Sequence, residues 1–477
     1  MLDKRKFYIN GEWVDPIVAN DLEVLNPATE KPVAVISMGT AADIDRAVAA
    51  AKKAFVSYSR TSVEQRLALM EKLLSIYKRR YDEMAQTITL ELGAPATMSR
   101  EQQADVGVGH LQGFIDALKR LHMREVLPNG DVMLREPIGV CGLITPWNWP
   151  INQIALKVVP ALATGSTCVL KPSEFTPLNA LLYAEMVHEA GFPAGTFNLV
   201  NGDGRNVGAA LSRHKDVDMM SFTGSTRAGI AVSKDAADTV KRVTLELGGK
   251  SPNIVFEDAD LEERVTASVL ECFNNSGQSC DAPTRLLVQK SVYDKVVEIA
   301  TRIGREVKVG NPAEEGSHIG PLVSDIQFSR VQALIEAGIA EGARLLVGGA
   351  GKPQGFKQGY FVKPTIFADV NNTMRIAREE VFGPVLAIMP FETEEEAIEI
   401  ANDTSYGLAA YVQSGDPKRA ERVAARLRAG MVHINGGPHR YGSPFGGYKQ
   451  SGNGREGGMF GLEDFLEVKT VHRPDAA

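Results

Sequence analysis

Val140-Cys141-Gly142-Leu143-Ile144 is the first of five short apolar runs that alternate with helix-patterned segments. The other four runs are residues 167–170, 197–200, 219–222 and 243–247. Strands buried on both faces have this composition, and their alternation with helices is typical of a parallel sheet covered on both sides. We therefore predict an α/β fold built on such a sheet.

The chain before this sheet is predicted to be mostly helical. Residues 7–37 form short strands and turns, and a long helix begins after Ser62, which opens a capping box. The apolar stripe of that helix runs from Leu67 to Ile88. A further helix is expected over residues 101–121.

The second half of the chain is predicted to have a sheet of its own. After Gly248-Gly249, a plausible domain junction, the alternation resumes. The expected elements are helices 261–273, 291–305, 324–341, 394–402 and 417–429 and strands 284–290, 343–347, 384–390, 409–413 and 431–435. Residues 126–135 should form a hairpin outside the core. Residues 463–471 should form a terminal strand that needs a partner sheet, here or in another subunit.

Length and composition limit the classes of protein to which the chain can belong. At 477 residues it is too long for one core, so two or three domains are expected. The net charge of −7 argues against a nucleic-acid partner, and no apolar run is long enough to predict a membrane span. The 4 cysteines show neither CxxC nor zinc spacing, so we expect no metal site and a reducing, cytoplasmic location.

The segment Asn274-Asn275-Ser276-Gly277-Gln278-Ser279-Cys280 carries the first candidate for chemistry. Its Asn, Ser and Gly residues end a helix and open a loop, so Cys280 lies between a helix and a strand, where reactive groups are often displayed. A free thiol has a pKa of about 8.5, so little of it is thiolate at neutral pH. The alternative interpretation of Cys280 is a small buried core residue.

Two other segments could supply partners for a nucleophile. Asn148 lies between Trp147 and Trp149 in a stiff turn, where its amide could donate to an oxyanion. Glu246 lies at the end of an apolar strand, and a carboxylate among apolar neighbours should have a raised pKa, which suits a general base. The alternatives are a packing turn for Asn148 and an exposed position on a half-buried strand for Glu246.

A cofactor site is suggested by residues 222–229, which follow a strand and open a helix. Their glycines have Gly-x4-Gly spacing, and backbone amides there could approach a pyrophosphate, although an ordinary βα turn fits as well. Lys171 and Glu174 follow another strand and suit ribose hydroxyls; the alternative is a surface loop with a capping glutamate. Residues 379–385 and 444–452, taken alone, read as loops.

Taken together and in this order, these segments resemble those of the aldehyde dehydrogenase superfamily. The resemblance covers nearly the whole chain, from an NGEW-type start at Asn10 to an EVKTV-type end at Val471. It implies a Rossmann-like cofactor-binding domain, an α/β catalytic domain and a projecting β-strand oligomerisation arm, in a homodimer or homotetramer. The implied bounds are 1–118 and 138–248 for the cofactor domain, 249–450 for the catalytic domain, and 119–137 and 463–473 for the arm.

The resemblance also implies roles for individual residues. Cys280 would be the nucleophile, Asn148 would hold the oxyanion together with the Cys280 backbone N–H, and Glu246 would activate the hydrolytic water. The implied cofactor residues are Trp147 and Ser225 at the pyrophosphate, Lys171 and Glu174 at the adenosine ribose, Glu380 and Phe382 at the nicotinamide riboside, and Gly224 and Gly248.

The implied reaction oxidises an aldehyde to the carboxylic acid through a cysteine thiohemiacetal and a thioester. Relatives that pass the thioester to coenzyme A or phosphate do not need the base, so the presence of Glu246 favours hydrolysis. Glu174 can chelate both ribose hydroxyls and would repel a 2′-phosphate, which predicts NAD rather than NADP as the cofactor.

The candidate substrate residues are polar. His439 and Arg440 lie in the loop that borders the substrate mouth in the family, and Gln153 follows Asn148 on the next helix. They predict a substrate with a polar or carboxylate tail, such as a semialdehyde. The alternatives are solvated loop residues and an aliphatic, aromatic or betaine-type aldehyde. Asp281 would oppose thiolate formation and an anionic aldehyde unless its side chain points away.

Two other functions compete with this interpretation. A cofactor-independent cysteine hydrolase generally needs a histidine, and none lies in the motifs around Cys280. A non-catalytic protein with the same fold would be free to lose Cys280, Glu246 or Asn148, and all three are present.

Overall fold

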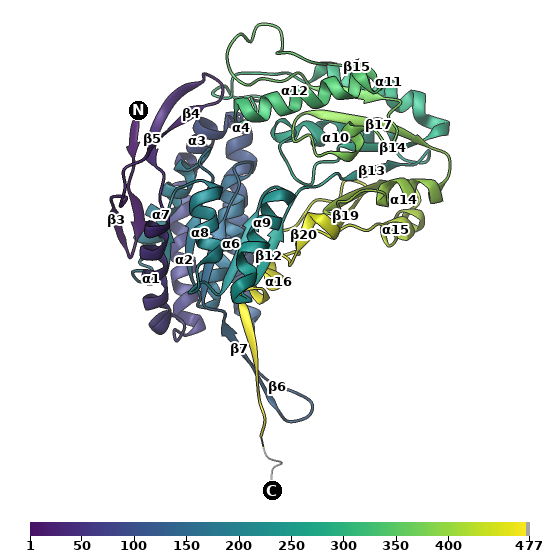
Figure 1. The fold of residues 1–477 in the computed structure, drawn as a ribbon. Coiled ribbons are helices and arrows are strands. Elements are labelled where there is room, and N and C mark those ends of the chain that lie inside the picture. The colour runs from purple at the N-terminus through teal and green to yellow at the C-terminus, as the bar shows by residue number, and fades with distance from the viewer. Residues whose placement is uncertain (474–477) are drawn as a thin grey trace.

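The computed structural model describes residues 1–473, which form two lobes and a projecting arm (Figure 1). The first lobe contains an eight-stranded sheet, the second a seven-stranded sheet, and the arm a three-stranded sheet. A small sheet of β1 (Leu2–Lys4), β5 (Lys31–Ser37) and β4 (Asp21–Asn26) lies at the N-terminal end. Within the described residues, no helix is long and apolar enough to cross a membrane.

The first lobe has the strand order β20-β12-β11-β8-β9-β10-β2-β3. Its strands are β2 (Phe7–Ile9), β3 (Glu12–Val14), β8 (Val140–Ile144), β9 (Thr167–Lys171), β10 (Phe197–Leu199), β11 (Met219–Thr223), β12 (Arg242–Glu246) and β20 (Gly452–Asn453). The middle five strands pair in parallel, and four of them are buried along their whole length. The five predicted apolar runs are therefore confirmed as one parallel sheet.

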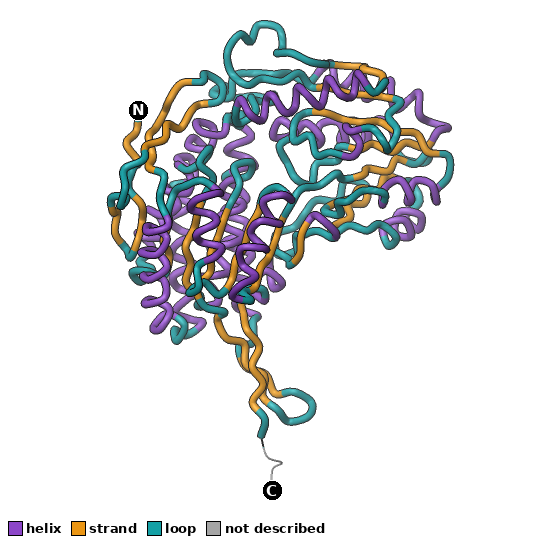
Figure 2. Tube along the Cα trace, viewed as in Figure 1, coloured by secondary structure: helices purple, strands orange, loops and turns teal. Residues whose placement is uncertain are grey.

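Helices cover both faces of this sheet, as Figure 2 shows in purple. They are α1 (Ala41–Tyr58), α2 (Val63–Arg79), α3 (Tyr81–Leu92), α4 (Ala96–Met98), α5 (Asp105–Arg120), α6 (Pro150–Thr164), α7 (Leu178–Ala190), α8 (Ala209–Arg213), α9 (Thr226–Ala236) and α16 (Gly458–Glu463). One apolar cluster packs α2, α3, α5, α6 and α7 against the sheet, and a second packs α1, α8 and α9. The strands therefore lie in a two-sided core.

Three predicted helix boundaries are wrong. The long helix after Ser62 is two helices, because Arg80 leaves helical geometry (φ −101°, ψ 18°) while its side chain pairs with Glu83 and Glu185. The helix expected over 101–121 starts with a π-helical turn at Ser99–Gln103. The helix expected over 417–429 ends at Ala424. In the first case the apolar pattern continues past the point where the local backbone geometry changes.

The second lobe has the strand order β15-β16-β17-β14-β13-β18-β19, parallel except for β15. Its strands are β13 (Pro252–Val255), β14 (Arg285–Gln289), β15 (Arg344–Val347), β16 (Thr365–Ala368), β17 (Val385–Phe391), β18 (Ala409–Gln413) and β19 (Met431–Ile434). Its helices are α10 (Leu261–Phe273), α11 (Tyr293–Glu306), α12 (Asp325–Ala340), α13 (Arg375–Arg378), α14 (Glu394–Asn402) and α15 (Pro417–Ala424). The second sheet is confirmed, and β13 and β16 are strands that the sequence pattern did not predict.

The arm joins β6 (Arg124–Val126), β7 (Val132–Pro137) and β21 (Leu466–Val471) in one antiparallel sheet. It projects from the bottom of the first lobe in Figure 1, with the yellow C-terminal strand beside the hairpin. The predicted hairpin and terminal strand are therefore each other's partners within this chain. Five of the six β21 residues are exposed, including Val468 at 62%.

Candidate active site

Cys280 lies on the loop between α10 and β14, where the sequence placed it. After α10 the chain makes a short turn in which Asn275 and Ser276 have left-handed backbone angles (φ 51° and 57°). Gly277 follows at φ 72°, and a Cβ there would stand 2.1 Å from the carbonyl oxygen of Gly383. The turn therefore requires a glycine, and it holds Cys280 half-buried at the loop end.

The turn between β8 and α6 is tied to this loop by side-chain hydrogen bonds. Asn148, 3% exposed, donates from Nδ2 to the carbonyl oxygen of Gln278 at 2.9 Å. The Trp149 indole N–H donates to Ser279 Oγ at 2.8 Å. In return, Asn275 Nδ2 donates to the backbone oxygen of Asn148 at 2.8 Å. Two segments about 130 residues apart are thus locked together beside Cys280.

Two cavities meet at Cys280. The inner cavity, about 150 Å³, lies against the carboxyl ends of β8 and β11. The outer cavity, about 500 Å³, lies against α5, α6 and the loop around Pro438. Of the described residues, Cys280 is the one that lines both. A group bonded to its sulfur can therefore be reached from either cavity.

The inner cavity is lined by six of the eight predicted cofactor residues: Trp147, Gly224, Ser225, Gly248, Glu380 and Phe382. Lys171 and Glu174 do not line it; they form an ion pair at 3.2 Å at the end of β9. Gln327 and Arg330 on α12 also line it, and no sequence motif marks either residue.

The geometry of the inner cavity fits the phosphate and nicotinamide parts of a dinucleotide. A Cβ at Gly248 would stand 2.5 Å from Glu380 Oε2, so a larger residue there would displace that carboxylate from its present position. Ser225 caps α9, which points its N-terminal amides at the end of β11, a usual place for a pyrophosphate. The rings of Trp147 and Phe382 contact each other edge to face, with 5.3 Å between their centroids, and form one wall of the cavity. The buried hydroxyl of Thr223 has no hydrogen-bond partner within the described residues and is free for a ligand.

Burial raises the pKa of the Cys280 thiol well above its usual range, and the carboxylates of Asp281, Glu380 and Glu246 raise it further, in that order. The thiol is therefore protonated at neutral pH in the free protein. A nucleophilic role requires that this proton be removed when substrate is present.

Glu246 ends β12 and is buried, 4% exposed. Burial raises its pKa well above the usual range, as the sequence predicted, and Glu456 adds to the shift. The exposed alternative for Glu246 is therefore wrong. Its two carboxylate oxygens have no hydrogen-bond partner among residues 1–473. Glu246 lines neither cavity, but its charge acts on Cys280.

The outer cavity contains two of the three predicted substrate residues, Gln153 and His439. Arg440 is exposed and does not line it, so its expected place in this cavity is wrong. Asp281 lines the cavity, so it does not point away from the substrate side of Cys280. This position could be found only once the loop conformation was known.

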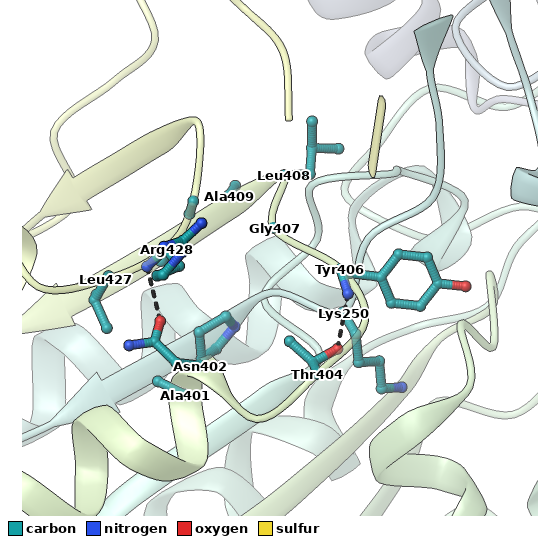
Figure 3. Close-up of a pocket in the computed structure, with 13 residues that line it drawn as sticks. Lys250, Ala401, Asn402, Thr404, Tyr406, Gly407, Leu408, Ala409, Leu427 and Arg428 are labelled. Atoms are coloured by element: carbon teal, nitrogen blue, oxygen red, sulfur yellow. Dashed lines mark hydrogen bonds between the residues drawn. The ribbon is translucent and has the colours of Figure 1, made fainter. Parts of the chain in front are cut away.

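A third, narrow cavity lies in the second lobe, near Lys250 and Tyr406 (Figure 3). The loop around it is held by hydrogen bonds, from Arg428 N to Asn402 Oδ1 at 2.7 Å and from Tyr406 N to Thr404 Oγ1 at 3.2 Å. At about 10 Å³ it has room for about one water molecule, so it is not a substrate site.

A protein-family model described as the aldehyde dehydrogenase family matches residues 13–471. The chain belongs to this family. It is 54% identical over 472 residues to the 3-succinoylsemialdehyde-pyridine dehydrogenase of a Pseudomonas species, with 99% of each chain covered. The expected family is thereby confirmed.

Solved structures of aldehyde dehydrogenases have the same fold. The enzyme from Bartonella henselae is 52% identical, with a TM-score of 0.98 and 99% of each chain covered. A mutant of aldehyde dehydrogenase C from Pseudomonas syringae, solved with NAD+ and octanal, is 50% identical. Its TM-score is 0.97, and the match covers 98% of this chain and 96% of that one. The α/β architecture with its two sheets is therefore that of an aldehyde dehydrogenase.

Proposed function

We propose that this aldehyde dehydrogenase oxidises an aldehyde to the free carboxylic acid, with NAD as cofactor. The observation that carries the proposal is the position of Cys280, which lines both cavities. An aldehyde in the outer cavity and a dinucleotide in the inner cavity would meet at its sulfur. Trp147, Gly224, Ser225, Gly248, Glu380 and Phe382 would hold the cofactor from the inner side.

The first step is addition of the Cys280 sulfur to the aldehyde carbon, with the thiol proton released to water. The carbonyl oxygen becomes an alkoxide, and the Asn148 amide and the Cys280 backbone N–H stabilise it. One donor of this kind contributes about 2.7–4 kcal/mol in the transition state. NAD, when bound, accepts a hydride from the substrate carbon. The Cys280 sulfur is then left holding the acid part of the substrate as a thioester.

The second step is hydrolysis of that thioester, and we assign its base to Glu246. The two carboxylate oxygens of Glu246 are buried and unpaired in the described structure, so they are free to bind a water molecule. Because the pKa of Glu246 is raised, its carboxylate is a stronger base than an ordinary glutamate once it has lost its proton. Water then attacks the thioester, and the free acid leaves.

Glu174 supports NAD over NADP. Its carboxylate is partly exposed beside Lys171, at the carboxyl end of a strand that neighbours β8. A carboxylate in that place accepts hydrogen bonds from ribose hydroxyls and repels a 2′-phosphate. The relative from Pseudomonas syringae was solved with NAD+, which agrees with this choice.

We further propose that the substrate is a polar aldehyde. Gln153 and His439 provide polar groups in the outer cavity, where Trp149 provides an apolar wall. The name of the relative from Pseudomonas joins a semialdehyde to a pyridine ring, and octanal was bound to the relative from Pseudomonas syringae. A cavity of about 500 Å³ has the usual size for a small-molecule ligand.

We also propose a cytoplasmic homodimer or homotetramer that assembles through the arm, with the three-part division of the chain given above. The exposed residues of β21 support this, because a free strand edge is a ready surface for pairing.

The test of the proposed function is reduction of NAD by the purified protein with a panel of aldehydes, followed at 340 nm. We expect NADH and free acid in equal amounts, with no requirement for coenzyme A or phosphate. A Cys280→Ser variant should form no acyl-enzyme. Failure of every aldehyde to reduce NAD or NADP would reject the proposal.

A further inference from the structure

The outer cavity opens into a side chamber of about 380 Å³. The residues that line both spaces are Glu271, Asp281, Pro438 and His439. Asp281 directly follows the nucleophile in sequence, so the junction of the two spaces lies beside Cys280. The tail of a substrate held on Cys280 must pass this junction or run along the outer cavity.

The outer cavity is acidic. Its lining includes four carboxylates, Glu101, Asp105, Glu271 and Asp281, and no lysine or arginine among the residues that the structure describes. Glu101 and Asp105 are exposed at its mouth. Burial lowers the pKa of His110 to about 4 and also lowers that of His439, so the histidines that line the cavity do not offset its charge at neutral pH. Burial raises the pKa of Glu271 to about 7 and also raises that of Asp281, so the negative charge of the cavity increases as pH rises.

Asp281 is the carboxylate nearest the reaction in sequence, and its backbone is fixed. The Tyr411 hydroxyl donates to the Asp281 backbone oxygen at 3.1 Å. No ion pair engages the Asp281 carboxylate within residues 1–473, although His433 and His439 lie within electrostatic range. Its charge also reaches the Cys280 sulfur, because Asp281 is the leading charged contributor to the raised thiol pKa. The carboxylate is therefore unpaired and acts at the reacting atom.

One arginine, Arg264, lines the side chamber. Its Nη1 donates to the backbone oxygen of Asn435 at 2.7 Å, and its Nη2 pairs with Glu263 at 2.9 Å, so its charge is already partly compensated. Arg440 lines neither space. A carboxylate tail in the outer cavity would therefore lose its hydration beside Asp281 and Glu271 without a lysine or arginine of the described lining to pair with.

We propose that Asp281 is a specificity-determining residue that excludes aldehydes with a carboxylate tail and admits those with an uncharged or cationic tail. This inference rests on the proposed function and narrows its polar substrates to those without a negative charge. The physical basis is like-charge repulsion in a partly desolvated cavity, together with the absence of lysine and arginine from the described lining of the outer cavity.

The first test compares three aldehydes with the same 3-phenylpropanal scaffold. They carry a methyl, a carboxylate or a trimethylammoniomethyl group at the para position. For the unaltered enzyme we expect kcat/KM to be at least about tenfold lower for the carboxylate than for either of the others, since like charges cost several kcal/mol. Asp281→Asn should raise the ratio of kcat/KM for the carboxylate to kcat/KM for the methyl compound about tenfold, and this ratio cancels any common effect of the variant on the Cys280 thiol. The matched control, Asp116→Asn at an exposed helix position, should leave all three unchanged.

The second test needs no aldehyde oxidation, so it separates this inference from the proposed function. Cys280 is alkylated with neutral iodoacetamide and with anionic iodoacetate, and each rate is divided by that of a free thiol. We expect iodoacetate to be selectively excluded, and Asp281→Asn to remove most of that selectivity. Cys280→Ser identifies the labelled site.

The outcomes are distinct. Equal or better use of the carboxylate aldehyde by the unaltered enzyme would overturn the role of Asp281 while leaving the proposed function intact. An unchanged ratio of the two alkylation rates in Asp281→Asn would overturn it even if no aldehyde is oxidised. A third outcome is that no aldehyde reduces NAD while iodoacetate is still selectively excluded. It would reject the proposed function and support Asp281 as the residue that excludes anionic groups.

Discussion

The side-chain amide of Asn148 donates to the carbonyl oxygen of Gln278 at 2.9 Å, across 130 residues of sequence. This bond aims the amide at the loop that carries Cys280. The Gln278 carbonyl oxygen is the acceptor of this N–H group, and an oxyanion formed at Cys280 could replace it as the acceptor. Asn148→Ala should therefore lower kcat/KM by about 10²–10³-fold, the usual cost of losing one oxyanion donor. Rapid-mixing measurement of the NADH burst would give the acylation rate directly.

The control for Asn148→Ala is a reaction of Cys280 that forms no oxyanion. Alkylation by iodoacetamide should keep nearly its normal rate in this variant, because the thiol itself is unchanged. If alkylation slows as much as aldehyde oxidation, the variant has disturbed the loop, and the amide has no separate role in stabilising the alkoxide.

Glu246→Gln should separate the two halves of the reaction. We expect a burst of NADH close to one equivalent, then a steady-state rate about 10²–10⁴-fold below normal, because the base that activates water is gone. Burial raises the pKa of Glu246, so its carboxyl loses its proton and becomes a base only at a higher pH than an ordinary glutamate does. Hydrolysis by the unaltered enzyme should therefore rise with pH, and that rise should disappear in the variant.

Glu336→Gln is a matched control for this prediction, since Glu336 is an exposed helix residue. It should have a normal burst, a normal steady-state rate and the normal pH profile. A steady-state rate in Glu246→Gln equal to that of Glu336→Gln would remove Glu246 from its assigned role.

Helix and strand positions were predictable where local chemistry marks them. α7 and α10 have the predicted bounds, because Gly191 ends the first with a left-handed residue and Asp260 caps the second. The division between α2 and α3 was not predictable, since the apolar stripe continues across Arg80. Strands β13 and β16 are four residues long and buried along their whole length, so they show no alternating pattern that would reveal them.

Some residues of the candidate site could likewise be recognised from the sequence, and others could not. Cys280, Asn148 and Glu246 were recognisable because each interrupts an apolar or stiff segment with a chemically reactive group. Arg440 was misplaced, because residue type alone does not tell which way a loop side chain points. The pair of Lys157 and Glu456 next to Glu246 was invisible, since 299 residues separate its members and only the packing of α6 against the C-terminal segment joins them.

That pair provides a prediction about stability. Lys157 is fully buried and Glu456 nearly so, and they form a direct ion pair. Lys157→Met would leave the Glu456 carboxylate buried, uncompensated and next to Glu246, at a cost of about 3–5 kcal/mol in the free energy of unfolding. Denaturation by urea, followed by tryptophan fluorescence, would measure the loss.

The double variant Lys157→Met/Glu456→Leu tests whether the loss comes from the unpaired charge. A buried ion pair replaced by apolar groups of similar volume often leaves stability nearly unchanged. We expect the double variant to be more stable than Lys157→Met alone. Additive losses from the two substitutions would instead point to packing defects at each position.

Glu174→Gln should weaken the preference for NAD. The carboxylate pairs with Lys171 at 3.2 Å, so the substitution removes a charge that repels a 2′-phosphate and frees an ammonium group that attracts one. The ratio of kcat/KM for NAD to that for NADP should fall at least about tenfold, equivalent to about 1.4 kcal/mol. Initial rates at 340 nm with each cofactor, at one fixed aldehyde concentration, would measure the ratio, with Glu336→Gln as the control. Because neither Lys171 nor Glu174 lines the inner cavity, an unchanged ratio would mean that the adenosine ribose lies away from β9 and that cofactor choice is made elsewhere.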